Sequence, residues 1–354
     1  MSRNLLPLSV LAALAGGTAA ADVPSVAVDI APVHSLVARV MEGIGAPKLI
    51  VPSGASPHEY SLRPSEAAAL QDADLVFWIG EDLAPWMADA VKNLAVNATV
   101  IALLDADGTI LLDFREGALF EAHAHEGEEH EEHAHDEDHA HADEEGHDQD
   151  HDEHAHDEDH AHADEEGHDQ DHDEHAHDDH GHADGDHDPH AWLSPENAGT
   201  WLNLIAAQLS AADPDNAGAY FANAATGRAE IEALSAEVNE TLDPVRGGKF
   251  IVFHDAYQYF ETAFDFPASG AISLGDASDP SPARIAEIQA RVREEGIDCV
   301  LAEPQFNPGL VATVLDGTDA STGVIDPLGA DLEPGPALYL QLIRNMATTL
   351  AGCL

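Results

Sequence analysis

Short apolar runs alternate with amphipathic stretches along the first part of the chain. Each run holds four or five residues, many of them β-branched, which predicts buried strands. The expected strands are Val26–Ile30, Lys48–Val51, Leu75–Ile79 and Ala98–Ala102. Pro32 and Pro64 each stand at the start of a stretch with helical spacing, which predicts helices over Val33–Glu42 and Arg63–Gln71. Strands that alternate with helices, without hairpin turns, are typical of a parallel α/β lobe.

The same alternation returns in the second half of the chain, after two consecutive helical stretches. The first stretch ends near Ala211, and the second, dense in Ala and Glu, runs from about Asp215 to Leu242 and is long for a globular helix. Strands are then expected at Lys249–Phe253, Ile297–Ala302 and Gly323–Pro327. Helices are expected at Ala256–Phe264, Pro282–Glu295, Gly309–Leu315 and Ala337–Ala351, with a loop rich in Asp, Ser and Pro between the first two. The long helix is well placed to connect two α/β halves.

The predicted fold is therefore α/β, with two lobes of parallel sheet joined by one long connecting helix. The expected limits are residues 22–120 and 188–211 for the first lobe, 212–245 for the connecting helix and 246–354 for the second lobe.

The N-terminus has the three parts of a secretory signal. Arg3 supplies a positive charge, Leu5–Ala15 forms an apolar core, and Ala19–Ala21 offers small residues for cleavage. We expect residues 1–21 to be removed; a buried N-terminal helix is the alternative. No Cys near the cleavage site could carry a lipid, and no later apolar run approaches the roughly 20 residues of a membrane span. The mature protein is therefore expected to be exported, soluble and without a lipid anchor.

A tract from Glu121 to Pro189 interrupts the first lobe. It contains 20 His and 31 Asp or Glu, with no Lys, Arg, aromatic or β-branched residue. A 21-residue unit at Glu132–Asp152 recurs identically at Glu153–Asp173. Because the tract has no apolar face to bury, we expect residues 121–187 to form a disordered, duplicated loop.

The tract also dominates the charge of the chain. Its carboxylates supply −31 of the net charge of −55, which leaves −24 for the rest. Such an acidic chain is not expected to bind nucleic acid through phosphate contacts, and it suits a small cation or a basic partner surface. Neutral imidazole is a transition-metal ligand, so the tract is expected to offer weak accessory zinc sites. These include His133, His135, His139, His141, His154, His156, His160, His162, His175 and His177.

Four of the 24 His lie outside the tract: His34, His58, His190 and His254. A lone His is more often a surface or core residue than a ligand. The last three, however, stand in connections that follow a strand or precede a helix, where open α/β sheets bind ligands. Asp326 occupies the same kind of place, at the end of the last predicted strand. Three imidazoles with one carboxylate or water form a tetrahedral shell that Zn²⁺ favours.

Several ordered motifs resemble those of the ZnuA-type zinc-binding components of bacterial ABC importers, in the TroA-like, cluster A-I family of solute-binding proteins. In chain order they are GASPHEYSLRPSEAAALQDADLVFWIGEDL, DPHAWLSPENA, FIVFHDAYQYF, CVLAEPQFNP and IDPLGA. They extend from about Val26 to the C-terminus, and the acidic His tract stands where zinc-specific members carry theirs. The resemblance implies two α/β lobes joined by one long helix, with the metal in the cleft between them.

The resemblance also implies a ligand set. The metal ligands of the family fall on His58 in PHEY, His190 in PHAWLSP and His254 in FHDAY, and Asp326 in DPLG matches a carboxylate close to the metal. Manganese-specific relatives carry a carboxylate where His254 stands, so nitrogen there is expected to favour zinc. In some zinc relatives an acidic residue precedes the first His, whereas Pro57 holds that place here. The fourth ligand is therefore open between Asp326 and water.

Three more residues are candidates for supporting roles. His34, near the start of the first predicted helix, is expected near the metal but outside its ligand shell. Glu59 and Asp255 each follow a candidate ligand directly and are expected to orient imidazoles.

The two cysteines of the chain are Cys299 and Cys353. In an exported protein an even pair suggests a disulfide, with two free buried thiols as the alternative. The bond would tie the chain end to the strand expected at Ile297–Ala302 and, in the chain-entropy model, stabilise the fold by about 4 kcal/mol. Zinc-type relatives have their disulfide at these two positions.

The favoured function is capture of Zn²⁺ in the periplasm and delivery to an inner-membrane ABC permease with its ATPase, by a protein expected to be a monomer. A periplasmic zinc buffer that acts mainly through the tract is the alternative. A zinc hydrolase would need a general base and a substrate pocket beside an open coordination position. Nothing beyond a water ligand argues for that, so no enzymatic activity is expected.

Overall fold

A computed structural model describes residues 23–115, 120, 187–273 and 280–354. The predicted signal segment and residues 121–186 of the tract, including its ten named accessory His, lie outside the described residues. Among the described residues, no helix is long and apolar enough to cross a membrane.

The first lobe is built on a four-stranded parallel sheet of order β2-β1-β3-β4. Its strands are β1 Val26–Val28, β2 Lys48–Leu49, β3 Leu75–Trp78 and β4 Thr99–Ala102. The inner strands β1 and β3 are buried over their whole length, as expected for a parallel sheet covered on both faces. Its helices are α1 Ala31–Val40, α2 Pro64–Gln71 and α3 Pro85–Leu94.

Helix α3 is absent from the sequence prediction, which placed no helix between the third and fourth strands. Its signals are nevertheless present. Pro85 occupies the first turn, and Met87 and Val91, four residues apart, are its buried residues.

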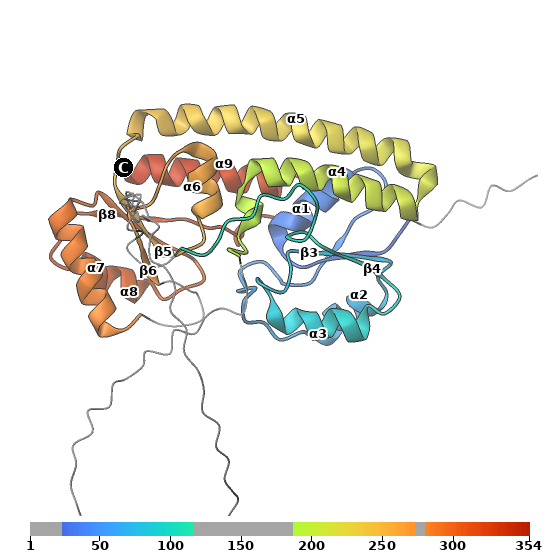
Figure 1. Cartoon of the computed structure of the whole chain (residues 1–354), viewed down its shortest axis with the longest axis horizontal. Helices are drawn as coiled ribbons and strands as arrows, with labels where there is room; N and C mark the ends of the chain where they lie inside the picture. The colour runs from blue at the N-terminus through green and yellow to red at the C-terminus, as the bar shows by residue number, and fades with distance from the viewer. Residues whose placement is uncertain (1–22, 116–119, 121–186, 274–279) are drawn as a thin grey trace, which may run out of the picture. The chain divides into compact units, whose positions relative to one another are not determined.

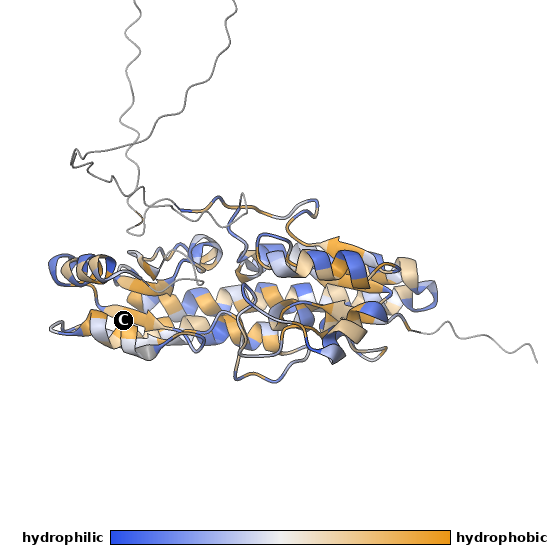
Figure 2. Ribbon diagram, turned by 90° about the horizontal axis from the view of Figure 1, so that it is seen from below, coloured by the Kyte–Doolittle hydropathy of each residue, from blue (hydrophilic) through white to orange (hydrophobic). Residues whose placement is uncertain are grey.

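The second lobe is built on another four-stranded parallel sheet, of order β6-β5-β7-β8. Its strands are β5 Phe250–His254, β6 Ala271–Ser273, β7 Cys299–Ala302 and β8 Ser321–Val324. Its helices are α6 Gln258–Phe264, α7 Pro282–Glu295, α8 Pro308–Leu315 and α9 Leu338–Cys353. Figure 2 shows strands that are mostly apolar and helices that carry both polar and apolar residues.

One strand of this lobe is missing from the sequence prediction, and several predicted limits are wrong, including those of the last strand, which spans Ser321–Val324 instead of Gly323–Pro327. The expected loop before Pro282 contains strand β6, whose three residues are buried and pair with β5. A run of three residues is too short to show a period, so the pattern gave no signal there. Strand β5 also extends one residue further than predicted and ends on His254.

The long helix between the sheets is present as predicted: α5 spans Ala217–Leu242 and runs alongside α4 and α9 (Figure 1). It is preceded by the 3-10 turn η1 Ala191–Leu193, α4 Pro195–Ala212 and the 3-10 turn η2 Pro214–Asn216. The residues that α5 buries recur every three or four positions: Tyr220, Ala224, Gly227, Ile231, Leu234, Val238 and Leu242. At Gly227 a Cβ would lie 3.0 Å from Leu202 Cδ1, so glycine lets α4 approach closely. The predicted residue limits of the lobes are not tested by this arrangement and stay predictions.

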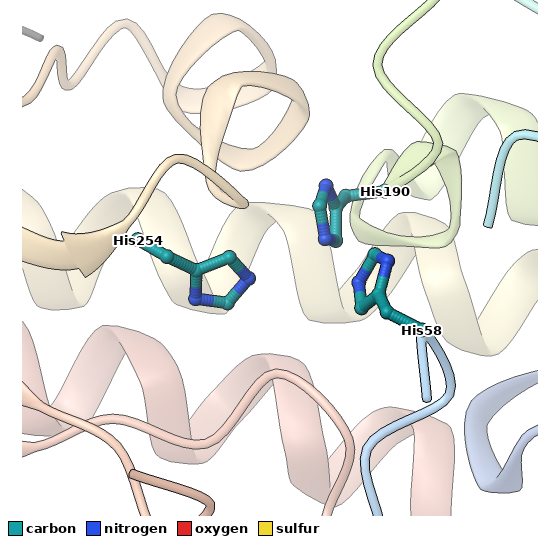
Figure 3. Close-up of side chains that lie close together, drawn as sticks. All are labelled: His58, His190 and His254. Atoms are coloured by element: carbon teal, nitrogen blue, oxygen red, sulfur yellow. The ribbon is translucent and has the colours of Figure 1, made fainter. Parts of the chain in front are cut away.

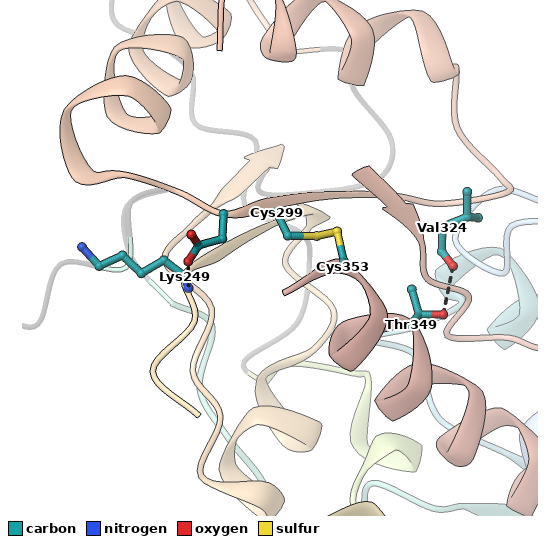
Figure 4. The surroundings of a disulfide bond; sticks show 6 residues. Lys249, Cys299, Val324, Thr349 and Cys353 are labelled. Atoms are coloured by element: carbon teal, nitrogen blue, oxygen red, sulfur yellow. Dashed lines mark hydrogen bonds between the residues drawn. A yellow bond between two sulfur atoms is a disulfide. The ribbon is translucent and has the colours of Figure 1, made fainter. Parts of the chain in front are cut away.

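The predicted disulfide is confirmed. Cys299 in β7 is bonded to Cys353 at the end of α9, with their Cα atoms 5.7 Å apart (Figure 4). Thr349, also in α9, donates a hydrogen bond of 3.4 Å from Oγ1 to Val324 O in β8. The last helix is thus fastened to two neighbouring strands of the second sheet.

Candidate metal centre

Three histidines from distant parts of the sequence meet in the structure. His58 lies in the loop between β2 and α2, His190 directly precedes η1, and His254 is the last residue of β5. The ring centroids are 5.4 Å apart for His58 and His190, 5.3 Å for His190 and His254, and 6.5 Å for His58 and His254. Each can offer one nitrogen such that the three nitrogens lie within 4.8 Å of one another (Figure 3). This is the sequence-predicted trio.

The loop that carries His58 is tied to a neighbouring helix. Trp86 in α3 donates a hydrogen bond of 2.7 Å from Nε1 to Pro57 O, directly before His58. The His58 backbone N–H donates to Ser56 Oγ at 3.3 Å. His58 is half-buried, and it is the most accessible of the three imidazoles.

His190 is held by a buried carboxylate two residues before it. Asp188 Oδ1 lies 2.7 Å from His190 Nδ1 and also accepts the His190 backbone N–H at 3.0 Å. When the Asp188 carboxylate is ionised it can only accept, so Nδ1 then carries the proton and Nε2 keeps its lone pair. That Nε2 is buried and has no hydrogen-bond partner among the described residues, so its lone pair is available to a cation.

His254 has an equivalent partner from the neighbouring strand. Glu303, directly after β7, places Oε1 2.7 Å from His254 Nδ1. Both imidazoles are only 5% exposed, and both carboxylates are buried. Two of the three histidines therefore present Nε2 to the shared space by the same device, a carboxylate that fixes the tautomer and raises the basicity of the ring.

Burial dominates the electrostatics of this group. Desolvation, with the nearby His254, lowers the pKa of His190 well below 6.5, so the ring stays neutral and able to bind a metal. Desolvation also raises the pKa of Asp188 to about 7, against the opposing effects of its backbone hydrogen bond and of Arg115.

The other candidate residues take different places. The Asp326 carboxylate is occupied by the turn that follows it: Oδ1 accepts the N–H groups of Leu328 and Gly329 at 3.0 Å each, and Oδ2 accepts that of Ala330 at 2.5 Å. Among the described residues, the group that could hold an ion contains the three His and not Asp326. The assignment of Asp326 as a ligand stays a prediction.

The predicted supporting residues are similarly dispersed. The Nε2 of His34 lies 3.2 Å from Pro47 O, and His34 is not in the group. Glu59 is exposed, whereas Asp255 is buried and pairs with the guanidinium of Arg115. Their roles toward the imidazoles stay predictions.

Sequence reasoning missed the two carboxylates that hold the imidazoles. Asp188 was counted with the acidic tract, where one more Asp gives no signal. Glu303 stands in the motif CVLAEPQFNP, directly after a predicted strand. That position at the carboxyl edge of a parallel sheet, shared with His254, could have identified it.

The space between the imidazoles is small. It has a volume of about 20 Å³, enough for about one water-sized occupant. Its other lining residues include Trp192, Phe306, Pro327 and Leu328. Three imidazole nitrogens around a space of this size suit a bare metal ion of borderline softness, not an organic ligand.

Comparison with known proteins identifies the family. The family model described as ZnuA, zinc-uptake complex component A periplasmic, matches residues 26–353. The chain belongs to the ZnuA family. It is 44% identical over 344 residues to the high-affinity zinc uptake system protein ZnuA of Brucella abortus (strain 2308), covering 97% of this chain and 96% of that protein. It is 45% identical over 353 residues to the protein of the same name from Paracoccus denitrificans (strain Pd 1222), covering 98% of each.

A solved structure described as a crystal structure of ZnuA has the same fold. Its TM-score is 0.66 at 21% sequence identity, covering 94% of this chain and 99% of that chain. The match to the ZnuA family and to this fold confirms the family resemblance and the two-sheet α/β architecture predicted from the sequence.

Proposed function

We propose that this ZnuA-family chain captures Zn²⁺ in the periplasm and delivers it to an inner-membrane ABC permease with its ATPase. One observation supports this most directly: three imidazole nitrogens lie within 4.8 Å of one another around a space for one small occupant. The carboxylate partners of His190 and His254 leave Nε2 of each ring free of a proton. Zinc prefers such a nitrogen-rich shell. The close relatives are high-affinity zinc uptake proteins by name.

The three nitrogens leave one tetrahedral position for a fourth ligand. Water is favoured over Asp326, because three backbone N–H groups already point at the two oxygens of that carboxylate. A zinc-bound crystal structure with anomalous scattering would identify both the metal and this ligand. No catalytic step is needed, since capture and release do not change the cargo.

A zinc titration against a competing chelator tests the proposal. We expect one tight site in a protein that lacks residues 121–186, and we expect its loss when His58, His190 and His254 are all replaced by Ala. His34→Gln is the matched control, because it removes a buried histidine of the first lobe outside the group. Equal zinc affinity with and without the three histidines would refute the assignment.

Zinc buffering by the tract is the second candidate, favoured by its 20 His. Titration of the full-length protein against the tract-deleted protein separates the two functions. Buffering predicts that most of the bound zinc disappears with the tract, whereas capture for transport predicts that one tight site survives.

A further inference from the structure

The segment Ile110–Arg115, here called the strap, crosses from the first lobe to the second beside the metal centre. At its first residue, Ile110 N donates to Asn197 Oδ1 in α4 at 2.7 Å, and Asn197 Nδ2 donates back to Ile110 O at 3.0 Å. Two residues later, Leu112 N donates at 3.0 Å to the hydroxyl of Tyr259 in α6. The segment after β4 runs from beneath α4 toward α6 in Figure 1. One short segment is therefore bonded to a helix of each lobe.

The strap also holds the residues that precede His190. Asp188 N donates to Leu112 O at 2.8 Å, and the Tyr259 hydroxyl donates to Asp188 O at 2.9 Å. Gln258, with its amide nitrogen turned toward these acceptors, donates to Asp188 Oδ2 and Asp113 O at 3.2 Å each. The residue whose carboxylate orients His190 is thus anchored to α6. Helix α6 belongs to the second lobe, and the same lobe supplies His254 from β5.

Arg115 closes the second-lobe end of the strap with two buried acids. Its Nη1 donates to Glu261 Oε2 at 2.7 Å and its Nη2 to Glu261 Oε1 at 3.0 Å. On its other side, Nε donates to both oxygens of Asp255 at 3.0 and 3.1 Å, and Nη2 contacts the same carboxylate. The Phe120 ring covers the guanidinium, its centroid 3.5 Å from Cζ. These four residues, Arg115, Phe120, Asp255 and Glu261, are here called the clasp. Asp255 directly follows His254, so the clasp lies next to the metal centre.

The clasp is an unusual use of charge in this chain, which has 13 Lys and Arg against 68 Asp and Glu. Arg115 is half-buried between two carboxylates, and its planar guanidinium gives each of them two hydrogen bonds, which the three donors of a lysine ammonium cannot match. Without it, two buried carboxylates would lose their cation and repel each other. The strap and the start of α6 would then separate. Asp188 is bonded to the strap, and His254 lies just before α6, so the separation would affect both residues.

We propose that Arg115 is a positioning residue for zinc retention: by locking the strap to α6 it keeps His190 and His254 at coordinating distance. This inference rests on the proposed function, because it assigns Arg115 a role toward the same three histidines. The ion-pair partners of Arg115 are the carboxylates of Asp255 and Glu261, so its effect passes through Asp255 and through the strap to Asp188. A looser strap would let the two rings move apart, and bound zinc would leave faster.

Zinc release from the full-length protein tests the proposal. The protein is loaded with one equivalent of zinc and mixed in a stopped-flow instrument with excess chromogenic chelator. The slow phase belongs to the metal centre if it vanishes in the variant with Ala at His58, His190 and His254. We expect Arg115→Gln to accelerate that phase about tenfold, the lower end of the range for residues that support metal ligands. Arg115→Lys should accelerate release less than Arg115→Gln, since lysine keeps the positive charge but lacks the planar guanidinium that hydrogen-bonds both carboxylates.

Arg39→Gln is the matched control. Arg39 makes a similar two-bond contact with Glu230, at 2.8 and 3.0 Å, and its side chain is 14% exposed against 17% for Arg115. It joins α1 to α5 away from the metal centre. A slow phase unchanged in Arg115→Gln, or accelerated equally in Arg39→Gln, would overturn the positioning role.

A second variant covers the case in which Arg115→Gln does not fold. Glu261→Gln keeps the size of the side chain and weakens one arm of the clasp, so a smaller acceleration is expected, and none would overturn the proposal. The failure of the proposed function has a different signature: the slow phase would then survive the loss of all three histidines.

Discussion

Replacement of Glu303 by Gln isolates the contribution of an orienting carboxylate. The change keeps the size of the side chain and an oxygen that can accept from His254 Nδ1, now 2.7 Å from Glu303 Oε1. It removes the negative charge that makes the imidazole a stronger donor to a cation. Substitutions of this kind reduce metal affinity about 10- to 100-fold, which corresponds to about 1.4–2.7 kcal/mol of binding free energy.

The same change should affect the zinc-free protein in the opposite direction. Glu303 is 4% exposed. A buried charge costs more desolvation than a buried amide. Glu303→Gln should therefore leave the zinc-free protein as stable as the wild type or more stable. Zinc binding raises the free energy of unfolding in proportion to the logarithm of the zinc affinity. At a fixed concentration of free zinc, that increase should therefore be smaller in Glu303→Gln by about 1.4–2.7 kcal/mol.

Thermal unfolding with and without buffered free zinc measures both quantities on one sample. Glu237→Gln is the control, since it removes a carboxylate that pairs with Arg344 on the surface and contacts no imidazole. Zinc affinity in Glu303→Gln within twofold of the wild type would refute the orienting role. Loss of stability without zinc would show that Glu303 acts instead as a structural acceptor.

Two more predictions concern protons and the disulfide. Burial raises the pKa of Asp188 to about 7, so below that pH the carboxyl group of the zinc-free protein is largely protonated. Zinc binding favours the ionised carboxylate beside His190 and must therefore release this proton. Proton release at pH 6.5, measured by calorimetry in buffers of different ionisation enthalpy, should fall in Asp188→Asn, and equal release in both proteins would contradict this. Replacement of Cys299 and Cys353 by Ser opens a loop with a sequence separation of 54 and should lower the free energy of unfolding by about 4 kcal/mol in chemical denaturation. A loss below about 1 kcal/mol would mean that the unfolded chain gains little freedom.

Apart from β6, the sequence predicted the strands, the long helix and the three histidines because each has a local signal. His254 follows an apolar run and His190 precedes a helix start, and such positions meet at the carboxyl edges of parallel sheets. The pairing of Asp188 with His190 and of Glu303 with His254 has no such signal. It depends on side-chain directions and, for Glu303, on which strands are neighbours. Strand β5 pairs with β7, although 44 residues separate the end of one from the start of the other. Arg115 was missed for the same reason, since its partners lie in α6 and the turn before it.

The difference between the tract and the metal centre is therefore one of orientation, not of ligand number. The tract has 20 His and the centre has three. In the centre, Asp188 and Glu303 select the tautomer of two rings, and the fold fixes their distance before a metal arrives. A metal that binds there does not have to order the chain, so little of its binding free energy is lost to conformational entropy. If the tract is disordered, as its composition predicts, each bound ion would have to order its imidazoles, at a cost of about 1–2 kcal/mol for every residue fixed. The tract could raise the local zinc concentration, but we expect tight retention at the three histidines, because the fold supplies partners that orient two of them.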